Sequence, residues 1–198
     1  MKFLFVVLTI ISLTQNWKIH CQRCGRPEEF GGDVRIVGGQ PVGYYKYPWF
    51  AILESVGTRR QVTCGGSLVT KRHIITAAHC FKGIKTNLAN VYQVSFGIYD
   101  NCIPNDPHRT IHQVESVKVH GQYAKEDPWF DIAIMTLKED VNYEPICLPP
   151  KGGQLPPYGV VTGFGVTQEG GFTEPCLQQE VAVDIHSRVS LISYFLVI

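Results

Sequence analysis

Short runs of apolar, β-branched and aromatic residues follow one another between residues 35 and 188, and clusters of glycine, proline and asparagine separate them. The clearest runs are residues 49–53, 61–64, 73–76 and 92–96. This rhythm is typical of antiparallel strands joined by turns, whereas βαβ units would place helical segments between the strands. The pattern therefore predicts an all-β protein, built as an antiparallel barrel or sandwich.

Two later segments refine this prediction. Residues 113–120 alternate apolar and polar side chains, which predicts a half-buried strand. Residues 132–137 are apolar almost throughout, which predicts a central strand covered on both faces. Residues 143–157 hold five prolines and two glycines, a composition that cannot sustain a ladder of backbone hydrogen bonds. We expect this segment to connect two domains.

The two ends of the chain carry apolar segments of a different kind. Met1 and Lys2 precede a stretch over residues 3–13 that has the length and character of a secretory signal, so we expect a signal peptide over residues 1–20 with its cleavage position left open. A membrane anchor or buried strand fits less well, because polar residues follow too soon for a membrane span. Residues 189–198 form a second apolar stretch, also too short to cross a bilayer.

Composition and charge narrow the classes of function. The 198 residues are 44% hydrophobic, which is enough for one or two compact units. Eighteen Lys and Arg nearly balance seventeen Asp and Glu, and neither sign forms a long run. Nothing therefore indicates binding to nucleic acid or to a membrane surface, and the expected partners are proteins or peptides. No pattern implies a cofactor.

Seven cysteines indicate a disulfide framework if the chain is exported, because the exterior of the cell is oxidising. They are Cys21, Cys24, Cys64, Cys80, Cys102, Cys147 and Cys176. A zinc site at Cys21 and Cys24 is the competing interpretation, but no second pair of ligands follows at matching spacing, so we expect no metal. The odd number leaves at least one thiol without a partner in this chain.

Three short segments point to a particular family. They are Arg-Ile-Val-Gly-Gly at residues 35–39, Thr-Ala-Ala-His-Cys at 76–80 and Asp-Ile-Ala-Ile at 131–134. In this order and spacing they resemble the chymotrypsin- and trypsin-like serine endopeptidases, and the likeness extends to Cys-Gly-Gly-Ser-Leu at 64–68, Ile-Cys-Leu-Pro at 146–149 and Gly-Phe-Gly at 163–165. The resemblance covers about residues 24–188.

The resemblance implies an antiparallel double β-barrel, with the first barrel complete and the second incomplete. The expected segments are a pro-segment over residues 21–35, the first barrel over 36–145, part of the second barrel over 146–188 and an aberrant apolar tail over 189–198. It also implies that cleavage between Arg35 and Ile36 activates a zymogen. In this family the freed ammonium pairs with a buried Asp beside the nucleophile, and that Asp has no counterpart here.

The same resemblance assigns catalytic roles and disulfide pairs. His79 corresponds to the general base, and Asp131 to the carboxylate that orients it. An imidazole suits this task because its ordinary pKa lies near neutrality. Cys64 and Cys80 match the bridge that holds the histidine-bearing turn. Cys147 is expected to pair with Cys24 or Cys21. Cys102 and Cys176 have no universal counterpart in the family, but the family places their loops on the same rim, so we expect a bridge between them.

The family's nucleophile segment, Gly-Asp-Ser-Gly-Gly-Pro, does not occur in these 198 residues. Ser67 falls in an expected first-barrel strand, and Ser190 and Ser193 lack flanking glycines. We therefore expect the chain to be inactive as given, a truncated form of a secreted endopeptidase. A non-catalytic decoy that binds inhibitors or receptors is the alternative, and a third possibility is completion by another chain.

Overall fold

The computed structural model describes residues 24–25, 40–56, 62–81, 83, 87–103, 105–123, 130–154, 156–166 and 175–185. The expected signal peptide, the bond between Arg35 and Ile36, Cys21 and the apolar tail lie outside these ranges. Within them, the residues in regular structure are nearly all in strands, together with two short 3-10 helices, η1 (Ala78–Phe81) and η2 (Leu88–Asn90). The prediction of an all-β protein is confirmed.

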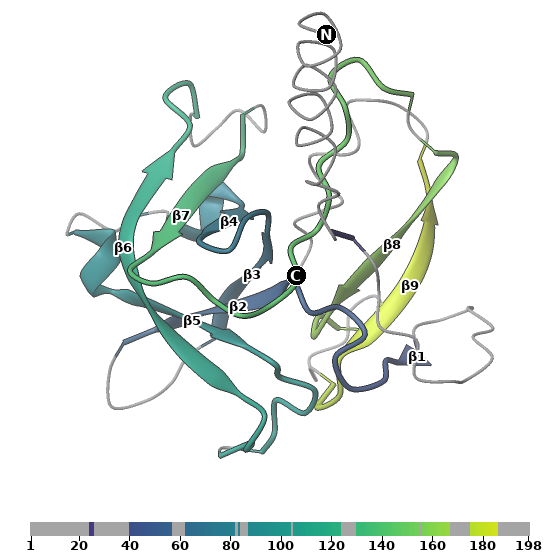
Figure 1. The fold of residues 1–198 in the computed structure, drawn as a ribbon, viewed down its shortest axis with the longest axis horizontal. Coiled ribbons are helices and arrows are strands. Elements are labelled where there is room, and N and C mark those ends of the chain that lie inside the picture. The colour runs from purple at the N-terminus through teal and green to yellow at the C-terminus, as the bar shows by residue number, and fades with distance from the viewer. Residues whose placement is uncertain are drawn as a thin grey trace, which may run out of the picture.

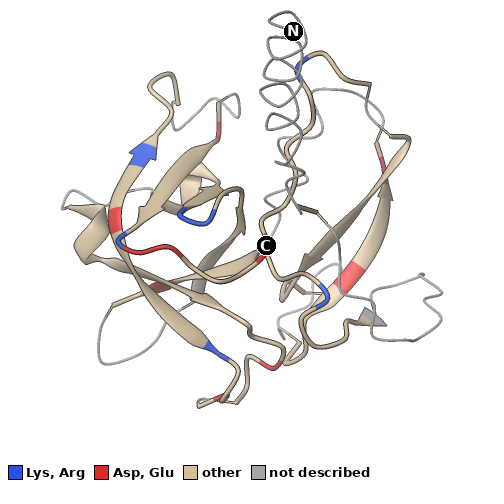
Figure 2. Cartoon of the chain, in the orientation of Figure 1, with Lys and Arg blue, Asp and Glu red and all other residues tan. Residues whose placement is uncertain are grey.

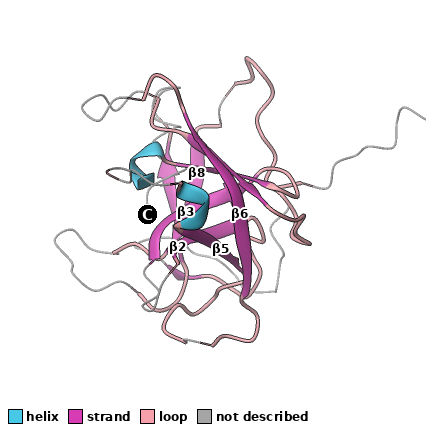
Figure 3. Ribbon diagram, turned by 90° about the vertical axis from the view of Figure 1, so that its left-hand side faces the viewer, coloured by secondary structure: helices cyan, strands magenta, loops and turns pink. Residues whose placement is uncertain are grey.

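Six antiparallel strands close into a barrel (Figure 1; Figure 3 shows it from the side). Around the barrel they run in the order β2 (Phe50–Ser55), β3 (Val62–Leu68), β4 (His73–Thr76), β7 (Ala133–Leu137), β6 (Thr110–Val119) and β5 (Tyr92–Phe96), and β5 pairs with β2 to close it. Closure leaves no unpaired strand edge in this unit. The barrel is the first of the two units that the sequence predicted.

The barrel interior is filled by side chains that alternate along each strand. Leu53 of β2, Phe96 of β5 and Met135 of β7 are completely buried there. The prediction that β7 is covered on both faces is wrong, because Ile134, which lies between two buried neighbours, is 43% exposed. In an antiparallel barrel wall one face meets the core and the other meets solvent, so an apolar residue on the outer face stays exposed.

A second, smaller sheet of three strands packs beside the barrel. Its strands run in the order β1 (Gln40–Pro41), β9 (Gln179–Asp184) and β8 (Tyr158–Gly163). The expected first-barrel boundaries included residues 40–41, but β1 pairs with β9 and so belongs to the second sheet. The described residues between β7 and β8 contain no strand or helix, as the proline content predicted.

Two kinds of contact join the barrel to the second sheet. Ile52 of β2 lies against Ile98 and Phe164, and the ring of Phe50 is 6.0 Å from that of Phe164. Lys46 Nζ is 2.8 Å from Glu180 Oε1, and the Tyr47 hydroxyl donates a hydrogen bond to the other oxygen of the same carboxylate. The charged carboxylate of β9 thus holds the chain segment that crosses from β1 to β2.

The charged residues of the described ranges are scattered over both units, with no single-sign patch along the ribbon (Figure 2). None of the helices in those ranges is long and apolar enough to cross a membrane.

Replacing Tyr47 by phenylalanine should reduce the loss of stability at alkaline pH. Burial, then the hydrogen bond to Glu180 and its negative charge, raise the pKa of Tyr47 above its ordinary value of 10.0. The folded chain therefore holds the phenolic proton more tightly than the unfolded chain does. This contribution to stability is fully present below pH 10.0 and is lost as the pH rises above it.

Urea unfolding at about pH 8 and about pH 11 measures the effect. The wild-type chain should lose more unfolding free energy between the two conditions than Tyr47→Phe does. Tyr158→Phe, on an exposed tyrosine of β8, is the matched control and should behave as the wild type. Equal losses in the wild type and Tyr47→Phe would contradict the prediction.

Candidate active site

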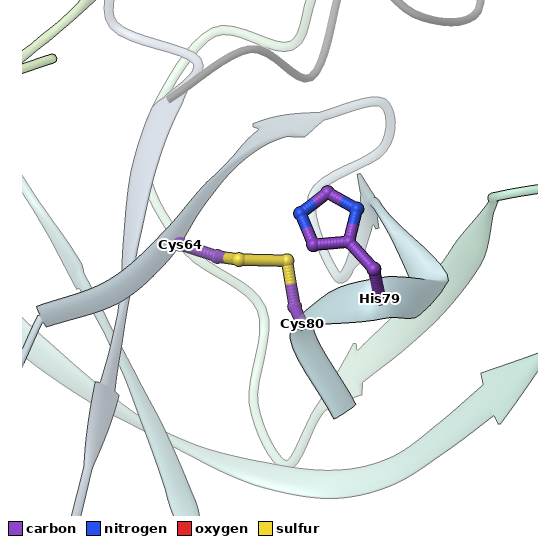
Figure 4. A group of neighbouring side chains, drawn as sticks. All are labelled: Cys64, His79 and Cys80. Atoms are coloured by element: carbon purple, nitrogen blue, oxygen red, sulfur yellow. A yellow bond between two sulfur atoms is a disulfide. The ribbon is translucent and has the colours of Figure 1, made fainter. Parts of the chain in front are cut away.

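His79 lies on η1, directly after β4. Its neighbours on that turn, Ala78 and Cys80, are buried, whereas the His79 side chain is 53% exposed. Small alanines let the turn sit against the barrel, and the Tyr92 hydroxyl donates a 2.9 Å hydrogen bond to the Cys80 carbonyl. The turn is therefore fixed while its imidazole, which lies beside the disulfide of Cys64 and Cys80 (Figure 4), stays half-exposed.

A disulfide ties this turn to the barrel. Cys64 of β3 is bonded to Cys80, across a sequence separation of 16 residues (Figure 4). Closing a loop of that size reduces the entropy of the unfolded chain and stabilises the fold by about 3 kcal/mol. Since Cys80 directly follows His79, the bond also restricts the backbone that carries the imidazole.

Asp131, which precedes β7, makes two hydrogen bonds to His79. Its Oδ1 accepts the backbone N–H of His79 at 2.8 Å, and its Oδ2 lies 2.7 Å from His79 Nδ1. An ionised carboxylate can only accept, so in neutral His79 the ring proton resides on Nδ1. The lone pair of Nε2 is then available, and no hydrogen-bond partner of Nε2 is present among the residues that the structure describes.

Tyr123 adds a neutral phenol to the surroundings of Asp131. Burial, and then the negative charge of Asp131, raise the pKa of Tyr123 above its ordinary value of 10.0. A phenol is already neutral at pH 7 at its ordinary pKa, so Tyr123 adds no second negative charge beside Asp131. An imidazolium formed at His79 would be stabilised by the charge of Asp131 at short range.

Within the described ranges no serine hydroxyl is hydrogen-bonded to His79. Ser67 lies inside β3, where its backbone pairs with Phe50 and Ile75. Ser95 donates to Glu54 on the outer side of β2. The described site therefore consists of the hydrogen-bonded pair of His79 and Asp131.

The structure contains two further disulfides, which select Cys24 over Cys21 as the partner of Cys147 and join Cys102 to Cys176 as expected. Cys24 is bonded to Cys147, and the N–H of neighbouring Gly25 donates to the Pro145 carbonyl at 2.9 Å. Cys102 is bonded to Cys176, linking the loop after β5 to the segment before β9. The first bond fastens the N-terminal segment to the domain connection, and the second fastens the barrel to the second sheet.

Two side-chain groups have the composition of metal sites in the described part of the chain. They are Cys64, His79 and Cys80, and Asp100, Cys102 and Cys176. In both, the two cysteines are bonded to each other. A disulfide sulfur is not a thiolate, which is the form that binds zinc, so neither group offers a set of zinc ligands while oxidised.

Two features of the structure were not predicted from the sequence. Phe130, next to Asp131, has φ of +61°, a left-handed conformation that bulky residues rarely adopt. Glu54 and Arg109 form a buried ion pair at the barrel wall. A charged residue in the apolar run 50–55 is a signal for a buried partner, but nothing in the sequence identifies Arg109 as that partner.

Comparison with known proteins identifies the family of the chain. Residues 36–194 match the family model described as Trypsin. The chain is 36% identical over 139 residues to coagulation factor XI from Bos taurus, an alignment that covers 67% of this chain and 22% of that protein. The chain thus spans about a fifth of the length of the curated relative that it matches. Because the family match takes in most of the chain, this protein belongs to the trypsin-like family of serine peptidases.

Proposed function

We propose that His79 and Asp131 are the base and the orienting carboxylate of a secreted serine endopeptidase. The observation that carries the proposal is the pair of hydrogen bonds from Asp131, to the backbone N–H and to Nδ1 of His79. Together they fix the imidazole in the tautomer whose Nε2 can accept a proton. Proteins or peptides are the substrates that this chemistry serves.

The reaction is an acyl transfer from a peptide bond to a serine hydroxyl. His79 Nε2 takes the hydroxyl proton as the oxygen attacks the carbonyl carbon, and the resulting imidazolium is stabilised by Asp131. The same proton then passes to the amine that leaves as the C–N bond breaks. Water repeats the sequence on the acyl-enzyme, which releases the acid and restores the hydroxyl.

The hydroxyl itself is proposed to come from a Gly-Asp-Ser-Gly-Gly segment outside the printed 198 residues, which do not contain that motif. The printed chain alone is then inactive, because a peptidase lacking its nucleophile keeps only the residual rate that the oxyanion hole provides. That hole is formed beside the nucleophile, so its donors would be missing with the serine.

Export and activation complete the proposal. Three disulfides in the described residues suit an oxidising compartment, and the apolar stretch at residues 3–13 suits a secretory signal. Cleavage between Arg35 and Ile36 would create the new N-terminus of the active form. The bond between Cys24 and Cys147 would then keep the N-terminal segment attached.

A decoy that presents peptidase loops to an inhibitor is the second candidate, and the missing nucleophile motif is the observation that favours it. The pairing of His79 with Asp131 favours the endopeptidase, since binding alone does not need a fixed imidazole tautomer.

The test compares the 198-residue chain with a chimera. In the chimera, residues 1–184 of this chain are followed by the remaining part of the peptidase domain of bovine factor XI. After cleavage at Arg35, we expect the chimera to hydrolyse peptide esters and to react with a serine-directed phosphonate, and the printed chain to do neither. Reaction of the printed chain would disprove the proposed absence of a nucleophile. A folded, cleaved chimera without activity would favour the decoy.

A further inference from the structure

Phe130 begins a tight turn whose central residue is Asp131. Its φ of +61° is one of two left-handed non-glycine conformations in the described ranges. The Ile132 N–H donates to the Phe130 carbonyl at 2.7 Å, which closes a three-residue turn around Asp131. Immediately afterwards β7 begins and the chain returns to extended pairing with β6. The turn thus sets the direction in which the Asp131 side chain leaves the backbone.

The aromatic ring of Phe130 stacks on the imidazole of His120, the residue that follows β6. The two rings are parallel within 5°, and their centroids are 4.8 Å apart. His120 is itself held by the sheet, because its N–H donates to the Ile132 carbonyl at 3.0 Å. Its Nδ1 accepts the Gln122 N–H at 3.3 Å, which fixes the ring.

The stack explains why an unfavourable backbone conformation persists at Phe130. A bulky residue at positive φ reverts to the extended region unless its surroundings hold it. Phe130 is 43% exposed, so burial in the core does not hold it. The contact with His120 is the ring contact that Phe130 makes in the described part of the chain, and it joins the turn to the rigid end of β6.

We propose that Phe130, stacked on His120, is a positioning residue for the Asp131 and His79 pair. Its left-handed conformation turns the Asp131 carboxylate toward both the backbone N–H and Nδ1 of His79. A catalytic role for Phe130 rests on the proposed function. Its effect on the hydrogen bonds between Asp131 and His79 does not, because those bonds form without a nucleophile.

The tautomer of His79 provides a readout that does not depend on activity. In the 198-residue chain with ¹⁵N-labelled histidines, neutral His79 should show an Nδ1–H resonance at low field, assigned by its loss in His79→Gln. Phe130→Val places a β-branched residue at positive φ, and we expect the population with the Nδ1–H hydrogen bond to fall roughly tenfold. Phe130→Tyr keeps the stack and should restore the wild-type signal.

His120→Ala removes the stack without touching the turn, and it should reduce the same signal in the same direction. Tyr158→Val, which exchanges an exposed aromatic residue on β8, is the matched control and should leave the signal unchanged. An unaltered His79 signal in either Phe130→Val or His120→Ala would overturn the inference, and His120→Ala decides the matter if Phe130→Val does not fold. An inactive chimera with this signal intact would count against the proposed function alone.

Discussion

Replacing Arg109 by methionine is expected to lower the free energy of unfolding by about 3–5 kcal/mol. The side chain of Glu54 is fully buried and that of Arg109 is 5% exposed, so the two charges neutralise each other away from water. Without Arg109, Glu54 Oε2 keeps hydrogen bonds from Ser95 at 3.0 Å and Gln93 at 3.3 Å. These two donors are neutral and do not replace the positive charge of Arg109. Urea unfolding with the disulfides intact measures the loss.

A double variant separates the uncompensated charge from the lost packing. Glu54→Leu combined with Arg109→Met removes both charges and should recover most of the stability that the single variant loses. Glu115→Gln, which weakens the exposed pair with Arg72 at 2.9 Å, is the surface control and should cost less than about 1 kcal/mol. A loss below about 1 kcal/mol in Arg109→Met, with no recovery in the double variant, would contradict the prediction.

The strand content of the first barrel could be predicted because its signal is local. Runs such as residues 73–76 and 92–96 coincide with β4 and β5, since apolar β-branched runs bounded by turn residues have few other stable structures. Whether one or both faces of β7 are buried could not be predicted in this way. The sequence does not distinguish an apolar residue on the outer face, such as Ile134, from one in the core.

The pairing of β1 with β9 could not be predicted from the sequence either. Two residues make that strand, and their partners lie about 140 positions away in the chain, at Gln179 and Glu180. Hydrophobic periodicity carries no information over such a separation. The Glu180 carboxylate also contacts Lys46 and Tyr47, shortly after β1, and these tertiary contacts accompany the pairing.

The candidate pair of His79 and Asp131 was predicted from a motif resemblance, and the structure adds the geometry that motifs do not contain. A spacing of 52 residues between His79 and Asp131 says nothing of which oxygen meets which nitrogen. The left-handed turn at Phe130 could not be predicted either, because positions with positive φ are usually occupied by glycine or asparagine and not by phenylalanine.

Asp131→Asn in the cleaved chimera is expected to lower kcat by about 10⁴, the loss known for the same change in a well-studied triad, which corresponds to about 5 kcal/mol. The two hydrogen bonds from Asp131 explain the size of the effect. The backbone N–H of His79 requires an acceptor at the position of Oδ1, so the amide oxygen of asparagine must lie there. The NH₂ group then faces Nδ1 and forces it to accept.

The ring proton consequently moves to Nε2, the atom that must accept the serine proton, and the base is lost although the ring stays in place. We expect KM to change little, because substrate binding does not use this hydrogen bond, and kcat to carry the loss. His79→Ala is the reference, and adding Asp131→Asn to it should cost little more, since the two residues act as one unit. A loss of less than about tenfold in the single variant would show that Asp131 does not select the tautomer.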